Sequence, residues 1–437
     1  MNLAMPDHRW GEADLESLQR DTFNYFLHWT NPKNGLVCDK TARDWPASIA
    51  ATGLALAAYP VAVDRGFITR IAAVEIVLAT LRFFWNSAHG PEHDATGYHG
   101  FYYHFLDMQT GRRAWQCELS TVDSAILLAG ALTAGAYFNA DTKEEKELRA
   151  IADELYRRAD WSWAQGGGAT VTHGWKPESG FLQWRWEGYD EALIVYILGL
   201  GSPTHPLPEE SYAAWASTYE WKTSYGYEYL YAGPLFTHQI SHIWIDFRGI
   251  QDAFMRDKGM DYFENSRRAT YVQQQYAIEN PLKFVGYRND CWGISASDGP
   301  GPESLKVDGI QRQFLDYAGR GVPYGPDDGT IAPWAVAASL PFAPDIVLPV
   351  LRHCIHDLKL NESSRYGFRA SFNPTYPSVS GNPNGWVSPW YFGLNEGPTI
   401  LMIENYRTNL VWRLMRECPY ITAGLRRAGF SGGWLSK

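Results

Sequence analysis

Three glutamates stand where a carboxyl group could perform acid or base chemistry, each at the start of an apolar, helix-like run. Glu118 lies in CELSTVDSAILLAG, Glu191 in WRWEGYDEALIVYIL and Glu396 in WYFGLNEGPTILMIENYR. Cleavage of a glycosidic bond uses two carboxyl groups, one protonated as general acid and one ionised as base or nucleophile. Glu191 is our candidate for the acid, and Glu396 or Glu118 is our candidate for the second carboxyl.

The residues next to Glu191 favour a protonated carboxyl at that position. Trp186 and Tyr189 precede it and a wholly apolar helix follows, so partial desolvation would raise its pKa and suit a general acid. The candidate sugar contacts in the same block are Trp186, Glu187, Tyr189 and Asp190. Acids in a first helical turn also complement the helix macrodipole, and this alternative stays open here.

Further acids and aromatic residues lie in long segments rich in Gly, Trp, Tyr and Asp. Flat rings can pack on the C–H face of a sugar, and carboxylates can accept hydrogen bonds from its hydroxyls. Asp123 also fits a helix-start capping group in STVD, and DDGT also fits a tight turn. The candidate sugar-binding residues outside the Glu191 block are Asp123, Trp292, Asp298, Tyr324, Asp327 and Asp328.

The segment HQISHIWIDFRGIQD combines histidines with other polar residues. His238 and His242 have the i, i+4 spacing of metal ligands on a helix, but HEXXH is absent and no third ligand is evident. We therefore predict no metal site, and we assign His242, Asp246 and Arg248 to structural or sugar-contacting roles. The sequence also lacks a GxSxG elbow, a Walker A motif and a GxGxxG that opens a helix, and it predicts no cofactor.

These candidate residues need a scaffold, and hydrophobic periodicity predicts helices joined mostly as hairpins, without convincing strands. The first helix of each pair is apolar on every face and the second carries a polar face, which indicates an inner and an outer ring. We predict an all-α (α/α)6 toroid with the long loops at one mouth, in one domain over 1–437; an irregular helical solenoid is the alternative. The predicted helices are 12–29, 48–63, 69–85, 120–138, 143–159, 190–200, 209–219, 237–255, 262–279, 330–340, 344–354 and 395–416.

Composition excludes several classes of protein. The 38 basic and 48 acidic residues give a net charge of −10, which disfavours binding to nucleic acid. No apolar run is long enough to span a membrane. Five scattered cysteines argue against a disulfide framework, and no leader is visible, so we expect a cytoplasmic protein, or a periplasmic one if a leader has been removed. The aromatic content of 15% points instead to carbohydrate.

Several blocks together resemble the bacterial glycoamylase-like family, which includes endo-β-1,2-glucanases and related β-1,2-glucan transglycosylases. They are GYHGFYYHFLDMQTGRRAWQCELSTVDSAILLAG, KFVGYRNDCWGISASDGP, DDGTIAPWAVAASLPF and GLNEGPTILMIENYR. The resemblance implies an (α/α)6 toroid whose acidic, aromatic pocket cleaves a glucan, with Glu118, Asp123 and Glu191 among the pocket acids. Asn395–Glu396 stands where family glucanases tend to carry Asp-Gln, which leaves the identity of the base open.

The sequence therefore predicts a glycoside hydrolase whose partner is β-1,2-glucan or its oligosaccharides. A transglycosylase using the same site and a noncatalytic glycan-binding toroid are the alternatives. A terpene-processing toroid would need Asp-rich metal motifs, of which only Asp327–Asp328 gives a hint.

Overall fold

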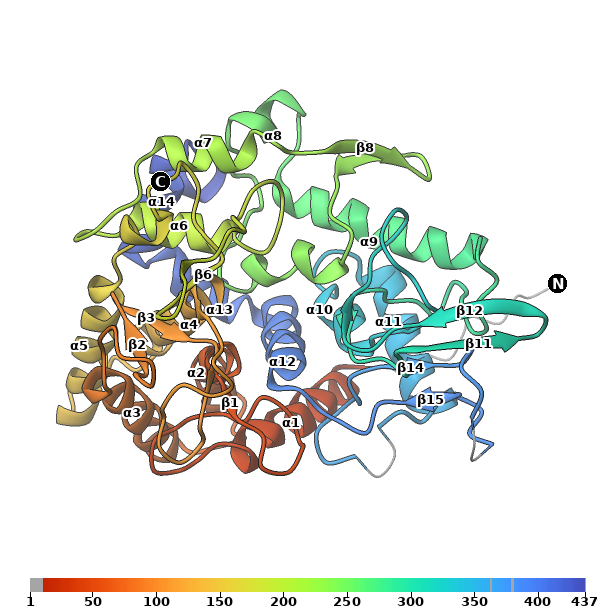
Figure 1. Ribbon diagram of the computed structural model, residues 1–437, viewed down its shortest axis with the longest axis horizontal. Coiled ribbons are helices and arrows are strands. Elements are labelled where there is room, and N and C mark those ends of the chain that lie inside the picture. The colour runs from red at the N-terminus through yellow and green to blue at the C-terminus, as the bar shows by residue number, and fades with distance from the viewer. Residues whose placement is uncertain (1–10, 362–363, 379–380, 437) are drawn as a thin grey trace.

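Five buried helices form the centre of the molecule (Figure 1). The computed structural model describes residues 11–361, 364–378 and 381–436. Almost every residue of these helices is buried, as their apolar composition on all faces requires. They pack against one another in the order α10–α12–α2–α4–α6. Their bounds are Ile49–Asp64 for α2, Thr121–Tyr137 for α4, Leu193–Gly201 for α6, Pro333–Ala338 for α10 and Gly393–Thr408 for α12.

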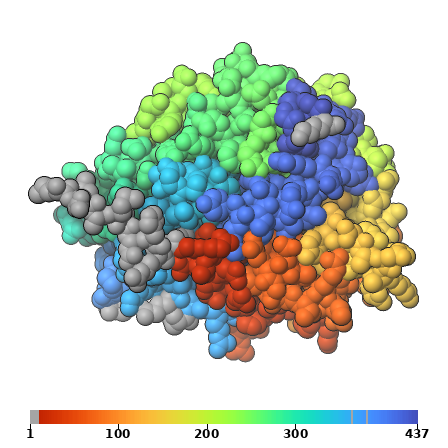
Figure 2. Space-filling view, turned by 180° about the vertical axis from the view of Figure 1, so that it is seen from behind, coloured from red at the N-terminus to blue at the C-terminus, as the bar shows by residue number. Residues whose placement is uncertain are grey.

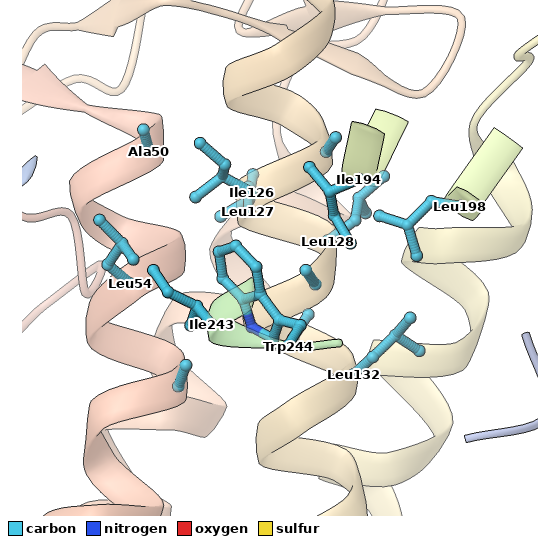
Figure 3. Close-up of a cluster of buried hydrophobic side chains, with 14 of the residues drawn as sticks. Ala50, Leu54, Ile126, Leu127, Leu128, Leu132, Ile194, Leu198, Ile243 and Trp244 are labelled. Carbon is cyan, nitrogen blue, oxygen red and sulfur yellow. The ribbon is translucent and has the colours of Figure 1, made fainter. Parts of the chain in front are cut away.

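Two short 3₁₀ turns, Leu235–His238 and Ile240–Ile243, lie between α6 and α10. They contact α10 and α12, and the Ile194 amide of α6 donates a hydrogen bond to Ser241 Oγ at 3.1 Å. In Figure 3 the Trp244 indole, which directly follows them, lies among side chains of α2 and α4. This segment therefore lies between α6 and α10, the two helices at the ends of the packing order given above.

The remaining helices cover this centre. In α5 the buried residues Leu148, Ala152 and Leu155 follow helical spacing, and Thr142 caps its start by accepting from the Glu145 amide. Figure 2 shows the red of α1 next to the blue of α12, which α1 contacts. The covering helices are α1 (Glu12–His28), α3 (Arg70–Asn86), α5 (Lys143–Arg158), α7 (Glu210–Ala216), α8 (Ala253–Asp257), α9 (Tyr262–Glu279), α11 (Pro344–Arg352), α13 (Leu410–Arg416) and α14 (Pro419–Arg427).

Glycines allow the backbones of α2 and α4 to touch. A Cβ added to Gly130 would lie 1.9 Å from the Gly53 carbonyl oxygen, and one added to Gly53 would lie 2.5 Å from the Ile126 carbonyl oxygen. No side chain fits at such separations, so these two positions fix how closely the helices approach. In Figure 3 Leu128 and Leu132 of α4 lie on the side of that helix toward Ile194 and Leu198, away from α2.

Short strands, absent from the sequence-based prediction, hold the loops together. The largest sheet is antiparallel, with strand order β2-β3-β5-β6-β7, and β11–β12 and β8–β9 form hairpins. The strands are β1 (Ala47–Ser48), β2 (Gly97–Tyr98), β3 (Phe101–Tyr103), β4 (Phe105–Leu106), β5 (Leu119–Ser120), β6 (Gly174–Lys176), β7 (Gly180–Phe181), β8 (Trp221–Ser224), β9 (Tyr227–Leu230), β10 (Ala296–Ser297), β11 (Glu303–Val307), β12 (Ile310–Phe314), β13 (Ala318–Gly319), β14 (Phe372–Asn373) and β15 (Trp386–Val387).

The observed helices confirm most of the predicted ones, with three differences. The predicted helix 237–255 is wrong: Gly249 adopts a φ of +74°, and only the 3₁₀ turns and the five-residue α8 are helical there. The predicted helix 395–416 is divided at Asn409, whose φ of 58° is left-handed. Helix α14 was not predicted.

Two further sequence-based expectations concern membranes and cysteines. No helix in the three described ranges is long and apolar enough to span a bilayer. All five cysteines are buried free thiols.

We predict that Gly130→Ala lowers the free energy of unfolding by about 1–3 kcal/mol, because the methyl group would overlap the α2 backbone. Gly135→Ala in the same helix is the control. Its Cβ would meet only the Ala152 methyl at 3.4 Å, so better helix propensity should raise stability by up to about 1 kcal/mol. Urea denaturation followed by circular dichroism measures both, and equal effects would contradict the proposed close contact.

Candidate active site

A cavity of about 650 Å³ lies at the N-terminal ends of α4, α6, α10 and α12. The loops that precede these helices supply most of its walls, as the sequence predicts. Its charged and histidine lining residues are Asp39, Lys40, His104, Glu118, Asp123, His173, Glu191, Asp298 and Asp316. Its aromatic lining residues are Trp45, Phe105, Trp115, Trp186, Phe236, Tyr317, Trp334 and Phe392.

Strand register brings His104 to Glu118. Tyr103 of β3 pairs with Leu119 of β5, which places the next residue of one strand opposite the preceding residue of the other. The His104 amide donates to the Glu118 carbonyl at 3.0 Å, and the side chains meet with Nδ1 of His104 2.8 Å from Oε1 of Glu118. The short sheet thus fixes an imidazole–carboxylate pair at the cavity wall.

Asp123 completes this cluster from the first turn of α4. Ser120 caps the helix by accepting from the Asp123 amide at 3.3 Å, and its hydroxyl donates to the Asp123 carboxylate at 2.5 Å. The same carboxylate lies 3.6 Å from His104 Nε2. Asp123 therefore belongs to both the capping interaction and the cavity wall, which are the two alternatives that the sequence left open.

His104 carries a positive charge between these carboxylates. Burial disfavours its charged form, but the carboxylates of Asp123, Glu118 and Asp39 outweigh burial and raise its pKa to about 9. For Glu118, burial acts to raise the pKa, but the hydrogen bond and charge of His104 lower it overall. At neutral pH the cluster thus contains an imidazolium and an ionised Glu118.

Glu191 has the opposite character. It lies on the turn that precedes α6 and is partly buried. Burial, assisted by the negative charge of Asp123, raises its pKa to about 7. The cavity therefore holds one carboxyl group that is still partly protonated at neutral pH and another that is ionised, which is the division that general acid and base chemistry requires.

Two more acids and a lysine lie on the side of the cavity formed by the 39–45 loop. Burial raises the pKa of Asp39 and of Asp298, and Asp298 accepts from Ser388 Oγ at 2.6 Å. The Lys40 ammonium lies 4.1 Å from the centroid of the Trp45 ring, a cation–π contact. These groups add hydrogen-bonding capacity on this wall.

Aromatic rings are held rigidly around the carboxyls. His173 stacks on Trp186 with ring centroids 3.7 Å apart, and the Trp186 indole donates to Thr121 Oγ1 at 3.0 Å. His104 stacks on Phe105 at 4.0 Å. Fixed rings beside polar groups form a surface suited to a ligand with both C–H faces and hydroxyls.

The structure brings five of the sequence-predicted site residues to this cavity and places the other eleven elsewhere. The five are Glu118, Asp123, Trp186, Glu191 and Asp298. Glu396 is 3% exposed and does not line the cavity, and burial raises its pKa well above its usual range. It therefore lies behind the wall formed by its neighbours Leu394 and Pro398.

Three residues of the Glu191 block also lie outside the cavity. Asp190 accepts from the Ala192 amide at 2.9 Å and from the Trp215 indole at 3.1 Å, in the turn that precedes α6. Burial and the charge of Glu191 raise its pKa to about 8. Glu187 accepts from Thr170 at 2.9 Å. Tyr189 is buried among aromatic rings, stacked on Tyr262.

The remaining candidates serve other contacts. Arg320 forms a fully buried ion pair with Asp328, the hydroxyls of Tyr276 and Tyr287 donate to Asp327, and Arg248 pairs with Asp246 at 2.7 Å. His242 is buried against Ser266, Trp292 is fully buried, and Tyr324 is exposed beside Tyr231. Burial or saturation by internal partners keeps most of this group from a ligand.

Sequence reasoning missed His104, Asp39, Lys40 and the Trp45–Trp115 pair. His104 stands in the conspicuous block GYHGFYYHF, but its role depends on strand pairing that periodicity did not predict. Among the described residues no group of three or more His, Cys, Asp or Glu is arranged to hold a metal ion.

Comparison with known proteins places this fold and cavity in a family. The family model described as "Glycoamylase: Putative glucoamylase" matches residues 183–419. The chain belongs to this family. A solved structure of a "putative glucoamylase" from Bacteroides uniformis has a TM-score of 0.85 at 31% identity and covers 98% of this chain and 100% of its own. The family resemblance drawn from the sequence is thereby confirmed.

Several relatives carry functional names. The endo-β-1,2-glucanase of Chitinophaga pinensis, solved with sophorotriose and glucose, has a TM-score of 0.83 at 26% identity over 97% of this chain and 99% of its own. The exo β-1,2-glucooligosaccharide sophorohydrolase of Parabacteroides distasonis is 29% identical over 459 residues, which cover 95% of this chain and 58% of that protein. The chain thus spans little more than half the length of this curated relative.

We predict that one of the twelve histidines titrates near pH 9, because carboxylates surround His104. The change Glu118→Gln removes one of these negative charges and should lower this pKa. Proton–nitrogen NMR of the imidazole resonances measures both values, with His104→Gln to assign the signal. An imidazole of His104 that titrates at or below its ordinary value of about 6.5 would contradict the cluster.

Proposed function

We propose that the protein is a glycoside hydrolase that cleaves β-1,2-glucan or its oligosaccharides. The observation that carries the proposal is the pairing, in one aromatic cavity, of a Glu191 whose pKa is raised to about 7 with a Glu118 whose pKa is lowered. The choice of linkage is supported by the names of relatives that act on β-1,2-linked glucans.

We further propose that the scaffold is an (α/α)6 toroid. The order α10–α12–α2–α4–α6 and the 3₁₀ segments that contact α10, α12 and α6 support a closed inner ring of six members. In this arrangement the sixth inner member is the pair of 3₁₀ turns rather than a full helix. The covering helices would then form the outer ring.

In the proposed mechanism Glu191 protonates the glycosidic oxygen as the bond to the anomeric carbon breaks. Glu118, kept ionised by His104, is the second carboxyl and acts on the anomeric carbon or on the water that attacks it. Asp123 lies farther from solvent, with its side chain 13% exposed against 28% for Glu118. It therefore contributes negative charge and holds His104 in place.

Removal of the general acid Glu191 should lower the rate of cleavage. We predict that wild-type protein releases oligosaccharides from β-1,2-glucan and that Glu191→Gln lowers kcat by about 10²–10⁴-fold, the usual contribution of general acid catalysis. Glu187→Gln is the matched control, because Glu187 is exposed and outside the cavity. Chromatography of the products measures both. If the wild type releases no product from any of the glucans tested, the proposal is wrong. If the Glu191 variant turns over at a near-normal rate, Glu191 is not the general acid.

The pH dependence follows from the same two groups. Activity should fall as pH rises through about 7, where Glu191 loses the proton it must donate, and it should also fall at acidic pH, where Glu118 gains a proton. In His104→Gln the loss of positive charge should raise the pKa of Glu118 and move the acidic limb to higher pH. Profiles of kcat/KM against pH test this, and an acidic limb unchanged in the variant would contradict it.

A further inference from the structure

A second cavity, of about 720 Å³, adjoins the first. Its walls come from residues that follow α1, from the 42–46 segment and from the loops after β4. Trp45 and Trp115 line both cavities, so the two spaces meet at this pair of rings. Each volume lies within the range of about 300–1,000 Å³ typical of a site for a small ligand, so the two cavities together offer more space than either one alone.

The two tryptophans are fixed in place. Their rings meet edge to face with centroids 4.8 Å apart. The Trp45 indole donates to Asp39 at 3.1 Å, which anchors this ring to a residue of the first cavity. Trp115 nevertheless remains 57% exposed, so a large apolar surface stays open to a ligand at the junction.

The backbone that presents Trp115 is unusual and is held by a buried arginine. Trp115 and Gln116 both adopt left-handed conformations, with φ of 54° and 51°, which large side chains rarely do. The side chain of Arg113 is 2% exposed. It donates to the carbonyls of Cys117 at 2.6 Å and Gln116 at 2.8 Å, and it pairs with Glu178. This network keeps Trp115 exposed instead of packed in the core.

The second cavity is lined by groups that can bind hydroxyls and not by apolar surface alone. The side chains of Asp44 and Gln109 are exposed and line this cavity but not the first one. The second cavity thus combines aromatic rings with carboxylate and carboxamide groups. The first cavity, around Glu191, has the same combination. The same kind of ligand therefore fits both cavities.

We propose that the second cavity binds further glucose units of the glucan chain that is cleaved in the first, with Trp45 and Trp115 as the platform that carries the chain between them. This inference rests on the proposed function and specifies its substrate as a chain long enough to occupy both cavities. Cleavage efficiency should therefore rise with chain length until the second cavity is filled.

The test compares kcat/KM on β-1,2-glucan polymer with kcat/KM on the shortest β-1,2-linked oligosaccharide that the wild type cleaves. Trp115→Ala should lower the value for the polymer about tenfold relative to the short substrate. Gln109→Ala, which touches only the second cavity, should lower it about two- to tenfold, as expected for one lost hydrogen bond, and leave the short substrate unaffected. Trp184→Ala, at an exposed ring that lines neither cavity, is the control and should change neither value.

A second measurement tests binding to the second cavity without relying on cleavage of the substrate. In the Glu191→Gln background, titration calorimetry should find that Trp115→Ala weakens binding of long chains more than of short ones. If both variants leave the ratio of long to short substrates unchanged, the second cavity is no part of the site and this inference fails while the hydrolase assignment stands. If the wild type releases no product from any β-1,2-glucan, the proposed function itself fails.

Discussion

An imidazolium held between carboxylates is the interaction on which the proposed chemistry depends. His104 contacts Glu118 at 2.8 Å and Asp123 at 3.6 Å, and its charge keeps Glu118 ionised in a partly buried place. Without that charge three carboxyls around one cavity would compete for protons. With it, the proton remains on Glu191, because burial and the negative charge of Asp123 raise the pKa of this carboxyl. Differences in environment thus separate the roles of chemically similar residues.

The scaffold makes this arrangement rigid. Gly53 and Gly130 allow α2 and α4 to approach closely and so set the distance between these helices. The cavity opens at the N-terminal ends of the buried helices. A short sheet then adds the register that aligns His104 with Glu118. Backbone packing and strand pairing, rather than local propensity, therefore place the reactive groups to the accuracy that catalysis requires.

The sequence predicts helices well where one face or all faces are consistently apolar. Helices 12–29, 69–85 and 143–159 end within one residue of α1, α3 and α5. The 237–255 segment has similar apolar spacing, but Gly249 and the ion pair of Asp246 with Arg248 turn the chain there. Glu118, Asp123 and Glu191, which the sequence places at helix starts, line the cavity, but Glu396, which the same pattern indicated, is buried away from it. Aromatic and acidic loops misled in part, because composition does not distinguish a ring packed in the core, such as Trp292, from one facing a cavity.

A crystal structure of the Glu191→Gln variant with a bound β-1,2-linked oligosaccharide would show whether Glu191 and Glu118 flank the bond that is cleaved. We expect a glycosidic oxygen within hydrogen-bond distance of the carboxamide that replaces the Glu191 carboxyl, with Glu118 on the other side of the anomeric carbon and still paired with His104. The separation of the two groups would also assign the stereochemistry, since about 5–5.5 Å indicates retention and about 6.5–9.5 Å inversion. A glucan bound in this cavity with its glycosidic oxygens remote from that carboxamide, or bound on another surface, would contradict the assignment of Glu191 as the general acid.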